Sequence, residues 1–346
     1  MPVWFWSEIA QRESPITMVK ESVVWEIAQS LLMPAGAIGD DCFHEKMEAF
    51  LKPSSSVRLY SVDAFVESQH FSFQFCSPYE VGWRTLAASL SDIAACGGTP
   101  LYFLVGLVLP VTATEDDVEG FYSGMKACLK ASHCTAQLIG GDTVKGTQWV
   151  VSITVIGEVA SSLKRNQAQA GDYLIATGHH GLSHLGLRLL QQSNTVDRAF
   201  LPVQQFLKPL PKLEAGQGLQ AISPTSALMD SSDGLADACL KIAHASGVQV
   251  LLNQDWLPIA SPFMAYGLEK AQPWILYGGE DFELVGTVRP DVWHANLITL
   301  KRLGFRVHGW VADAIVPSAW LVQGESLEQH QRLEPLLGDK TFQHFG

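Results

Sequence analysis

The sequence predicts an α/β (α+β) protein with two domains. Its 346 residues suffice for two domains of ordinary size, and a composition of 47% hydrophobic and 17% charged residues is typical of globular proteins with a large core. Strand-like and helix-like segments alternate along both halves of the chain. A polar stretch at 160–173, ASSLKRNQAQAGDY, separates these halves, so we predict domains at 1–160 and 161–346.

In the first half, two elements carry the residues of most interest. A strand is predicted at 57–66 because β-branched and aromatic residues dominate it, and Ser61 and Asp63 would share one of its faces. A helix is predicted over 80–96, because apolar residues recur at helical spacing and Gly97–Gly98 follow. The other predicted elements are a buried strand at 101–109, a helix at 115–131, a short strand running into a glycine turn at 136–142, and a strand at 148–159.

The second half repeats this alternation. Its clearest helix lies within MDSSDGLADACLKIAHASG at 229–247, where one apolar stripe ends at Gly247. The other predicted elements are a strand at 173–178, a helix at about 182–192, a strand at 248–252 and a strand–turn–strand unit at 274–288.

Charge and cysteine content exclude several classes of protein. A net charge of −12 disfavours a nucleic-acid partner. The six cysteines form no C-x-x-C pair, which favours a reducing cytoplasm without disulfides. The N-terminus lacks the pattern of a signal peptide, and the longest apolar run, 101–111, is about half a membrane span. We therefore expect a soluble cytoplasmic protein with no membrane partner.

Six aspartates in apolar surroundings are the main functional signal. Asp92 stands out, because aspartate is unfavourable inside a helix and its charge is costly beside an apolar stripe unless something pairs with it. Helix or turn capping would explain Asp142 or Asp233 equally well when each is taken singly. Together they favour a site for hard cations, above all Mg²⁺, which bridges carboxylates to substrate phosphates in phosphoryl transfer or nucleotide binding. The six are Asp41, Asp63, Asp92, Asp142, Asp230 and Asp233.

Familiar nucleotide and zinc motifs are absent. GGDTVKGT at 140–147 lacks the order of a P-loop, and GQGLQA at 216–221 matches a dinucleotide fingerprint without a preceding strand. His180 and His184 have a spacing that could bind zinc on a helix, but no third soft ligand stands nearby.

Seven motifs occur in the order found in one family. The sequence resembles thiamine-monophosphate kinase, of the superfamily that includes aminoimidazole ribonucleotide synthetase and selenophosphate synthetase, from about residue 38 to its end. The motifs are IGDDC, SVDAFVESQHF, VGWRTLAASLSDIAACGGTP, LIGGDTVKG, MDSSDGLADACLKIAHASG, LYGGEDFELVGTV and FQHF.

The resemblance implies a fold and a reaction. An N-terminal ATP- and Mg²⁺-binding domain would contribute its sheet to a barrel formed across a homodimer, and a C-terminal α/β domain would cover the active site. The reaction would be phosphorylation of thiamine monophosphate by ATP to give thiamine diphosphate, assisted by several Mg²⁺ ions. No catalytic base is expected, because the second pKa of a phosphate lies near ~6 and the nucleophile is already largely anionic.

The resemblance also assigns residues to this site. Of the adjacent pair Asp40–Asp41, which would point to opposite faces of an extended stretch, it assigns the metal to Asp41. Metal positions would be Asp41, Ser61, Val62 (through its carbonyl), Asp63, Asp92, Asp142, Asp230 and Asp233. ATP positions would be Tyr122, Gly141, Asp142, Arg165 and Ser232. Substrate positions would be His70, Glu280 and Phe342.

Two alternatives remain open at this point. Another ATP-using member of the superfamily, such as aminoimidazole ribonucleotide synthetase, would share the ATP and Mg²⁺ site but activate an amide oxygen. A non-catalytic nucleotide- or thiamine-binding protein could keep the same fold, although the intact aspartates argue against it.

Overall fold

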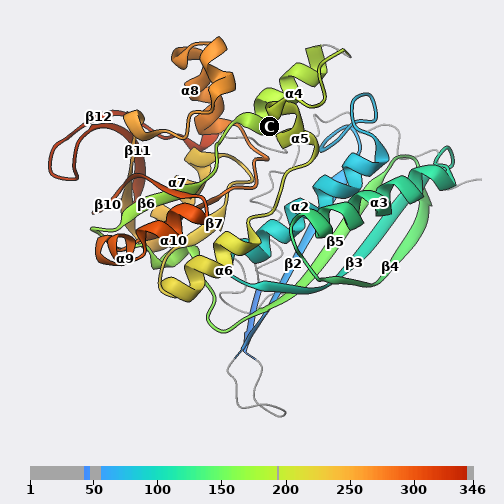
Figure 1. Ribbon diagram of the computed structural model, residues 1–346, viewed down its shortest axis with the longest axis horizontal. Helices are drawn as coiled ribbons and strands as arrows, with labels where there is room; N and C mark the ends of the chain where they lie inside the picture. Colours follow the sequence, from blue (N-terminus) through green and yellow to red (C-terminus); the bar gives the residue numbers. More distant parts are fainter. Residues whose placement is uncertain (1–42, 47–55, 193–194, 341–346) are drawn as a thin grey trace, which may run out of the picture. The chain divides into compact units, whose positions relative to one another are not determined.

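The computed structural model describes residues 43–46, 56–192 and 195–340. These residues belong to one compact unit that spans Gly39–Phe342. The unit holds two sheets, one of five strands and one of seven. Helices pack against each of the two sheets (Figure 1). Among the described residues, no helix is both long enough and apolar enough to cross a membrane.

The five-stranded sheet comes from the first half of the chain. Its spatial order is β1-β2-β5-β3-β4, and all neighbours are antiparallel except β3 and β4, which are parallel. The strands are β1 Phe43–Lys46, β2 Val57–Val66, β3 Thr99–Pro110, β4 Gln137–Gly146 and β5 Val150–Val159.

Two helices, α2 (Pro78–Ala95) and α3 (Glu115–Ala131), lie across one face of this sheet (Figure 1). Each begins with a capping box, which satisfies amide groups of its first turn. The helices approach closely because Gly82 and Gly124 carry no side chain where they cross; a Cβ at either would collide with the backbone of the other helix.

The seven-stranded sheet comes from the second half. Its order is β12-β11-β8-β10-β6-β9-β7, antiparallel apart from the parallel pair β8 and β11. The strands are β6 Tyr173–Thr177, β7 Leu228–Asp230, β8 Val248–Asn253, β9 Leu284–Val288, β10 Phe305–Asp313, β11 Ser318–Gly324 and β12 His330–Pro335.

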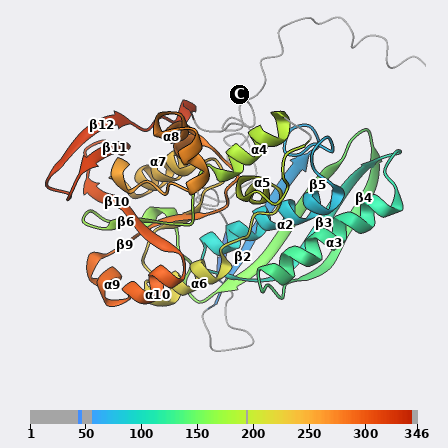
Figure 2. The same cartoon turned by 45° about the horizontal axis from the view of Figure 1, so that its top comes forward.

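Helices cover both faces of this second sheet (Figure 2). Alternate residues of β6 show the division: Leu174 packs with α7 and α8, whereas Ile175 packs with α6, α9 and α10. The helices are α4 Leu182–Gln192, α5 Leu201–Leu207, α6 Leu213–Ile222, α7 Leu235–Ser246, α8 Leu268–Tyr277, α9 Pro290–Ala295 and α10 Leu297–Arg302.

Helix α2 also packs against elements of the second half. Ala94 and Ala95 at its end share a core with Leu228 of β7 and Leu219 of α6, and the apolar side chains of α5 join the core beneath its first turns. The domain boundary predicted at residue 160 lies between the strands of the first sheet and those of the second. It stays a prediction, because the contacts of α2 with β7, α5 and α6 join the two halves into one unit.

The structure confirms several predicted elements and corrects two. The predicted bounds 57–66 and 115–131 are those of β2 and α3. The glycine turn predicted at 136–142 is wrong, because Gly140 and Gly141 lie inside β4. The first strand of the unit predicted at 274–288 is also wrong, because that segment ends helix α8.

Candidate active site

The segment GGEDFE, residues 278–283, links α8 to β9, and we call it the acidic loop. Glu280 and Phe282 both have positive φ, at 66° and 50°, although neither is glycine. Such backbone conformations are unfavourable for residues with a Cβ and persist only where surrounding contacts hold them. The partners of the acidic loop therefore determine its shape.

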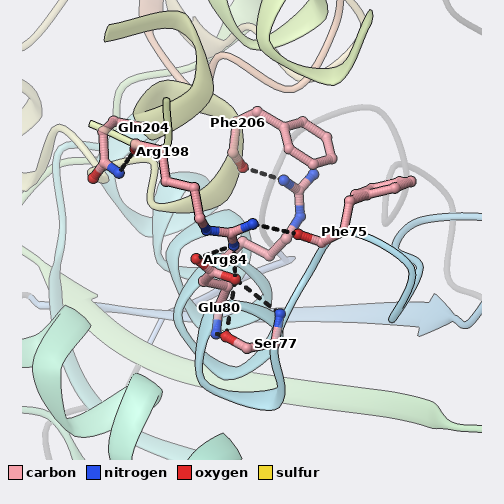
Figure 3. A network of polar contacts seen from close by, with 7 residues as sticks. All are labelled: Phe75, Ser77, Glu80, Arg84, Arg198, Gln204 and Phe206. Carbon is pink, nitrogen blue, oxygen red and sulfur yellow. Dashed lines mark hydrogen bonds and ion pairs between the residues drawn. The ribbon is translucent and has the colours of Figure 1, made fainter. Parts of the chain in front are cut away.

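Glu280 joins the acidic loop to helix α2. Its Oε1 pairs with Nη2 of Arg84 at 3.0 Å, and Arg84 is buried, with 4% of its side chain exposed. The guanidinium of Arg84 lies 4.0 Å from the ring centroid of Phe206 and donates to the carbonyl of the same residue (Figure 3). The Glu280 amide donates to the carbonyl of Ser232 at 2.6 Å. Glu280 thus connects α2, α5 and the segment before α7.

A second ion pair holds the chain before α5 against the start of α2. Arg198 donates to both carboxylate oxygens of Glu80 and to the carbonyl of Phe75 (Figure 3). Glu80 also closes the capping box with Ser77. Because Arg198 precedes α5 and Glu80 lies on α2, this ion pair holds α5, with its Phe206, beside the Arg84 side chain.

Asp281 caps helix α4 from the acidic loop. Its carboxylate accepts the amides of Gly181 at 2.5 Å and Ser183 at 2.8 Å. Complete burial raises the pKa of Asp281 to about 8, while these two hydrogen bonds favour the charged form and oppose that rise. The first turn of α4 is fixed to the loop by this one side chain.

Glu283 completes the acidic loop. It accepts from Oγ1 of Thr177 at 2.6 Å and pairs with Lys212 at 2.9 Å. Its carbonyl accepts the amide of Ser231 at 2.8 Å. Through Ser231 and Ser232 the acidic loop fixes the backbone beside Asp230 and Asp233.

The two predicted aspartates of this segment have different surroundings. Asp230 ends β7 and is 3% exposed. Asp233 pairs with Lys241 at 2.9 Å, and Asp237 pairs with the same ammonium at 2.8 Å. Burial alone would lower the pKa of Lys241, but the two carboxylates raise it. Gly234 is the N-cap of α7, so Asp233 does not cap that helix.

Ser61 and Asp92 meet between β2 and α2. The Ser61 hydroxyl donates to Oδ2 of Asp92, and Asp63 lies two residues further along the same face of β2. Val62 points to the opposite face and is 61% exposed. The face of β2 beneath α2 therefore carries the carboxylate and hydroxyl oxygens.

Gly141 and Asp142 lie on the far edge of the same sheet. The strand registers align Asp63 with Ile153, Val105 and Gly141 in turn, so three strand spacings, about 14 Å, separate Asp63 from Gly141. A Cβ at Gly141 would collide with the Val105 carbonyl, which explains the glycine.

The remaining predicted residues are dispersed. Tyr122 lies on α3 with its ring 5.2 Å from that of Phe121. Arg165 lies in a 3₁₀ turn that contacts α7. His70 accepts the amide of Val66 through Nδ1 at 3.0 Å. Asp41 and Phe342 fall outside the described residues.

No preformed metal centre exists within the described ranges, because no three His, Cys, Asp or Glu side chains are grouped there closely enough to hold a metal ion. The two histidines considered for zinc binding make other contacts. Nδ1 of His180 lies 3.2 Å from the Ser231 hydroxyl, and the centroid of the His184 ring lies 6.5 Å from that of the Trp274 ring. A cavity of about 840 Å³ beside residues 73–80 is lined by none of the predicted site residues.

Sequence reasoning missed Arg84 and Lys241, two cations that pair with predicted site carboxylates within the described residues. A signal for Arg84 existed, since it is the one basic residue within the apolar motif VGWRTLAASLSDIAAC. Its partner lies in a motif nearly two hundred residues away, so local pattern could not pair them.

Known proteins resemble this chain over most of its length. The family model for the AIR synthase related protein, N-terminal domain, matches residues 39–159. Thiamine-monophosphate kinase from Synechococcus elongatus is 37% identical over 90% of this chain and 92% of its own length, and that from Bacillus subtilis is 39% identical over 67% and 72%. The solved structure of AaThiL complexed with AMPPCP and TMP matches with a TM-score of 0.76 and 26% identity, covering 90% of this chain and 96% of that one. The chain therefore belongs to the thiamine-monophosphate kinase family.

Proposed function

We propose that this protein transfers the γ-phosphoryl group of ATP to thiamine monophosphate, giving ADP and thiamine diphosphate. The observation that carries the proposal is the match to a thiamine-monophosphate kinase over nine-tenths of both chains. One of the solved structures that this fold matches was obtained with AMPPCP and TMP, which are a nucleotide analogue and a phosphate-bearing ligand of the classes required.

The chemistry requires charge neutralisation more than proton transfer. A phosphate oxygen of thiamine monophosphate bonds to the γ-phosphorus, the bond to the β,γ-bridging oxygen breaks, and ADP leaves with that electron pair. Each like-charge contact at about 4 Å opposes the approach by about 4 kcal/mol at an effective dielectric constant of ~20. Cations and in-line positioning must supply the rate enhancement.

Mg²⁺ would supply that charge neutralisation when bound. The predicted ligands Asp41, Ser61, Asp63, Asp92, Asp142, Asp230 and Asp233, with the carbonyl of Val62, offer only oxygen donors, which fits a hard cation. Mg²⁺ ordinarily binds through one or two carboxylates together with substrate phosphates and water. The contact between Ser61 and Asp92 and the buried Asp230 are compatible with such sparse coordination.

The substrate positions are proposed on the same basis. Glu280 keeps 17% of its side chain exposed although one oxygen pairs with Arg84, so it can still meet a cationic thiamine ring. His70 and Phe342 would complete the thiamine site, and Phe342 would stack on the ring. The ATP positions would be Tyr122, Gly141, Asp142, Arg165 and Ser232.

A cytoplasmic homodimer is the proposed assembly. Strand β4 ends the five-stranded sheet and exposes Leu138, Ile139 and Val144. An exposed apolar edge strand is unfavourable in a monomer and is suited to pairing with a second chain.

The proposed activity is tested by incubating the purified protein with ATP, Mg²⁺ and thiamine monophosphate and measuring thiamine diphosphate. We expect product with the unaltered protein and none above background with Asp92→Asn, whose amide keeps a hydrogen-bond acceptor for Ser61 but loses the charge. The control variant Asp313→Asn changes an exposed carboxylate at the end of β10 and should retain full turnover.

The outcomes separate the alternatives. ADP release without thiamine diphosphate would favour a different ATP-using member of the superfamily, and ligand binding without ADP release would favour a binding protein. Near-normal turnover of Asp92→Asn at saturating Mg²⁺ would remove Asp92 from the proposed metal site.

A further inference from the structure

Arg84 is a buried cation with no assigned part in the proposed kinase reaction. It lies on α2, with 4% of its side chain exposed, and its Nη2 is 3.0 Å from Oε1 of Glu280 on the acidic loop. A guanidinium removed from water is unfavourable unless its partners are fixed in the right places. The partners of Arg84 therefore indicate its role.

Phe206 on α5 fixes the Arg84 guanidinium in two ways. Its carbonyl accepts a hydrogen bond from Nη1, and its ring centroid lies 4.0 Å from the guanidinium carbon (Figure 3). Together with the pair to Glu280, these contacts use the planar, forked shape of arginine, which a lysine ammonium lacks. Helix α5 thus holds the side chain of Arg84 in place for the carboxylate that it binds.

Gln205 fixes the backbone of the acidic loop from the same helix. Its Nε2 donates to the carbonyl of Asp281 at 3.1 Å. Neighbouring residues of α5 therefore hold Arg84 on one side and the residue after Glu280 on the other. This closed set of contacts can maintain the positive φ of 66° at Glu280, which is otherwise unfavourable for a residue with a Cβ.

Arg84 leaves Glu280 able to bind a further group. One carboxylate oxygen is paired, yet 17% of the Glu280 side chain stays exposed. A glutamate that is already ordered costs a ligand less conformational entropy than one that rotates freely. Two effects of Arg84 on a cationic ring therefore oppose each other: the ordering of Glu280 strengthens binding, and the positive charge of Arg84 weakens it.

We propose that Arg84 is a positioning residue for the thiamine moiety of the substrate and acts through Glu280. Without its cation, the largely buried Glu280 carboxylate would turn towards water and lose the orientation that the substrate meets. The inference rests on the proposed function, since it concerns the substrate position assigned to Glu280.

Isothermal titration calorimetry of the full-length protein tests this role with two probes, thiamine monophosphate and thiamine, which lacks the phosphate. We expect Arg84→Gln to weaken the binding of both by the same factor, about three- to tenfold, the scale expected for ordering one side chain. Arg84→Lys should recover part of the loss, because it keeps a cation beside Glu280 without the forked contacts. Tighter binding in Arg84→Gln would show that the charge dominates, and a loss confined to thiamine monophosphate would show a direct contact with the phosphate; either result would overturn the proposal.

A double-mutant cycle tests whether Arg84 acts through Glu280. Glu280→Gln should itself weaken thiamine binding, and Arg84→Gln added to it should have little further effect. Independent, additive losses would overturn the proposal. In turnover, Arg84→Gln should raise the KM for thiamine monophosphate and leave the KM for ATP unchanged, a split that general damage to the fold would not produce.

Two further variants separate this role from a loss of stability. Gln205→Met removes the donor to the acidic loop and should weaken thiamine binding in the same direction as Arg84→Gln. In the matched control Arg332→Gln, the arginine also lies over an aromatic ring, that of Trp320, and donates to a side chain, that of Gln249. Because Arg332 lies on β12, at the edge of the seven-stranded sheet remote from β9, its loss should leave thiamine affinity unchanged. An equal loss in this control, or unchanged affinity in Gln205→Met and Arg84→Gln alike, would overturn the proposal.

The proposed function and this inference fail in different ways. An unaltered protein that binds thiamine monophosphate but forms no thiamine diphosphate would contradict the kinase reaction, and the comparison of binding between variants would still decide the role of Arg84. An unaltered protein that forms product, while Arg84→Gln binds both probes with unchanged affinity, would overturn the inference alone. An unaltered protein that binds neither probe would overturn both.

Discussion

Glu280 and Asp281 are adjacent in sequence, yet their carboxylates have unrelated partners. Glu280 pairs with Arg84 on α2, whereas Asp281 accepts amides at the start of α4. The positive φ at Glu280 and Phe282 allows this divergence, since it reverses the backbone on either side of Asp281. Asp281 thus has a structural role as the cap of α4, whereas Glu280 has a proposed role in binding the substrate.

The pair between Arg84 and Glu280 should contribute strongly to stability. We expect Arg84→Met to lower the free energy of unfolding by about 3 kcal/mol, because it leaves a largely buried carboxylate without its cation. Adding Glu280→Gln should recover part of that loss, since the uncompensated charge is then removed. Urea denaturation monitored by circular dichroism measures both effects.

The control for this prediction is an ion pair of similar length at the surface. Arg289 and Asp291 lie 2.7 Å apart with more than half of each side chain exposed. Arg289→Met should therefore change the free energy of unfolding by less than about 1 kcal/mol. Equal losses for the two arginine variants would contradict a special role for Arg84.

For single residues, the sequence predicted candidate carboxylates but not the cations that pair with them. Asp92 stood out because it lies inside a predicted helix beside an apolar stripe, whereas Glu280 was selected only through the family resemblance. The pair of Arg84 with Glu280 and that of Lys241 with Asp233 could not be read from the sequence, because these partners meet only after folding.

Strand β4 shows how an element can be located yet misjudged. Its two glycines suggested a turn, but both lie within the strand, and β3 passes too close to Gly141 for a side chain there. The segment 274–277 was misjudged for a different reason. Trp274 and Ile275 have high β-propensity, and a short apolar run cannot by itself distinguish a strand from the last turn of α8.

The exposed edge β4 leads to a prediction about assembly. We expect Val144→Lys to convert the proposed homodimer to a monomer, because a charge on an exposed edge strand opposes pairing with a second chain. Sedimentation velocity would record the change in mass. Val316→Lys places the same charge on an exposed valine between β10 and β11 and should leave the dimer intact.

A monomeric unaltered protein would contradict this assembly. A dimer that persists in Val144→Lys would place the interface elsewhere.

At the scale of the whole molecule, two histidines that are buried among the described residues link stability to pH. Burial lowers the pKa of His180 to about 3 and that of His308 to about 4, from 6.5. Below pH 6.5 the unfolded chain binds protons that the folded protein does not. The free energy of unfolding should therefore fall with decreasing pH, by up to about 1.4 kcal/mol per pH unit for each histidine.

Variants isolate this effect from other titrating groups. The raised pKa of Asp281 acts in the opposite direction, since it favours folding at lower pH. His180→Gln or His308→Gln should flatten the loss of stability between neutral pH and about pH 5, whereas His244→Gln, an exposed histidine on α7, should not. Identical slopes in all three variants and the parent would contradict the prediction.

Periodicity located most elements of the first sheet and its two helices, and ordered motifs indicated membership of the family. No element was predicted after residue 288, although α9, α10 and three strands of the second sheet lie there. The contacts of α2 with the second half could not be predicted, because they depend on packing between segments far apart in sequence. The order of strands within each sheet could not be predicted for the same reason. Strand β2 pairs with β5, although α2, β3, α3 and β4 lie between them in the sequence.

The acidic loop has a consequence for how the protein folds. Its hydrogen bonds to Ser183, Gly181 and Thr177 span 98, 100 and 106 residues. Strand β9 follows the loop directly and pairs with β6 across a similar separation, with Ala176 opposite Val285. One closure of the chain therefore brings the loop and this part of the second sheet together, and its entropic cost is shared by both sets of contacts. The acidic loop and the pairing of β6 with β9 should form in the same step of folding.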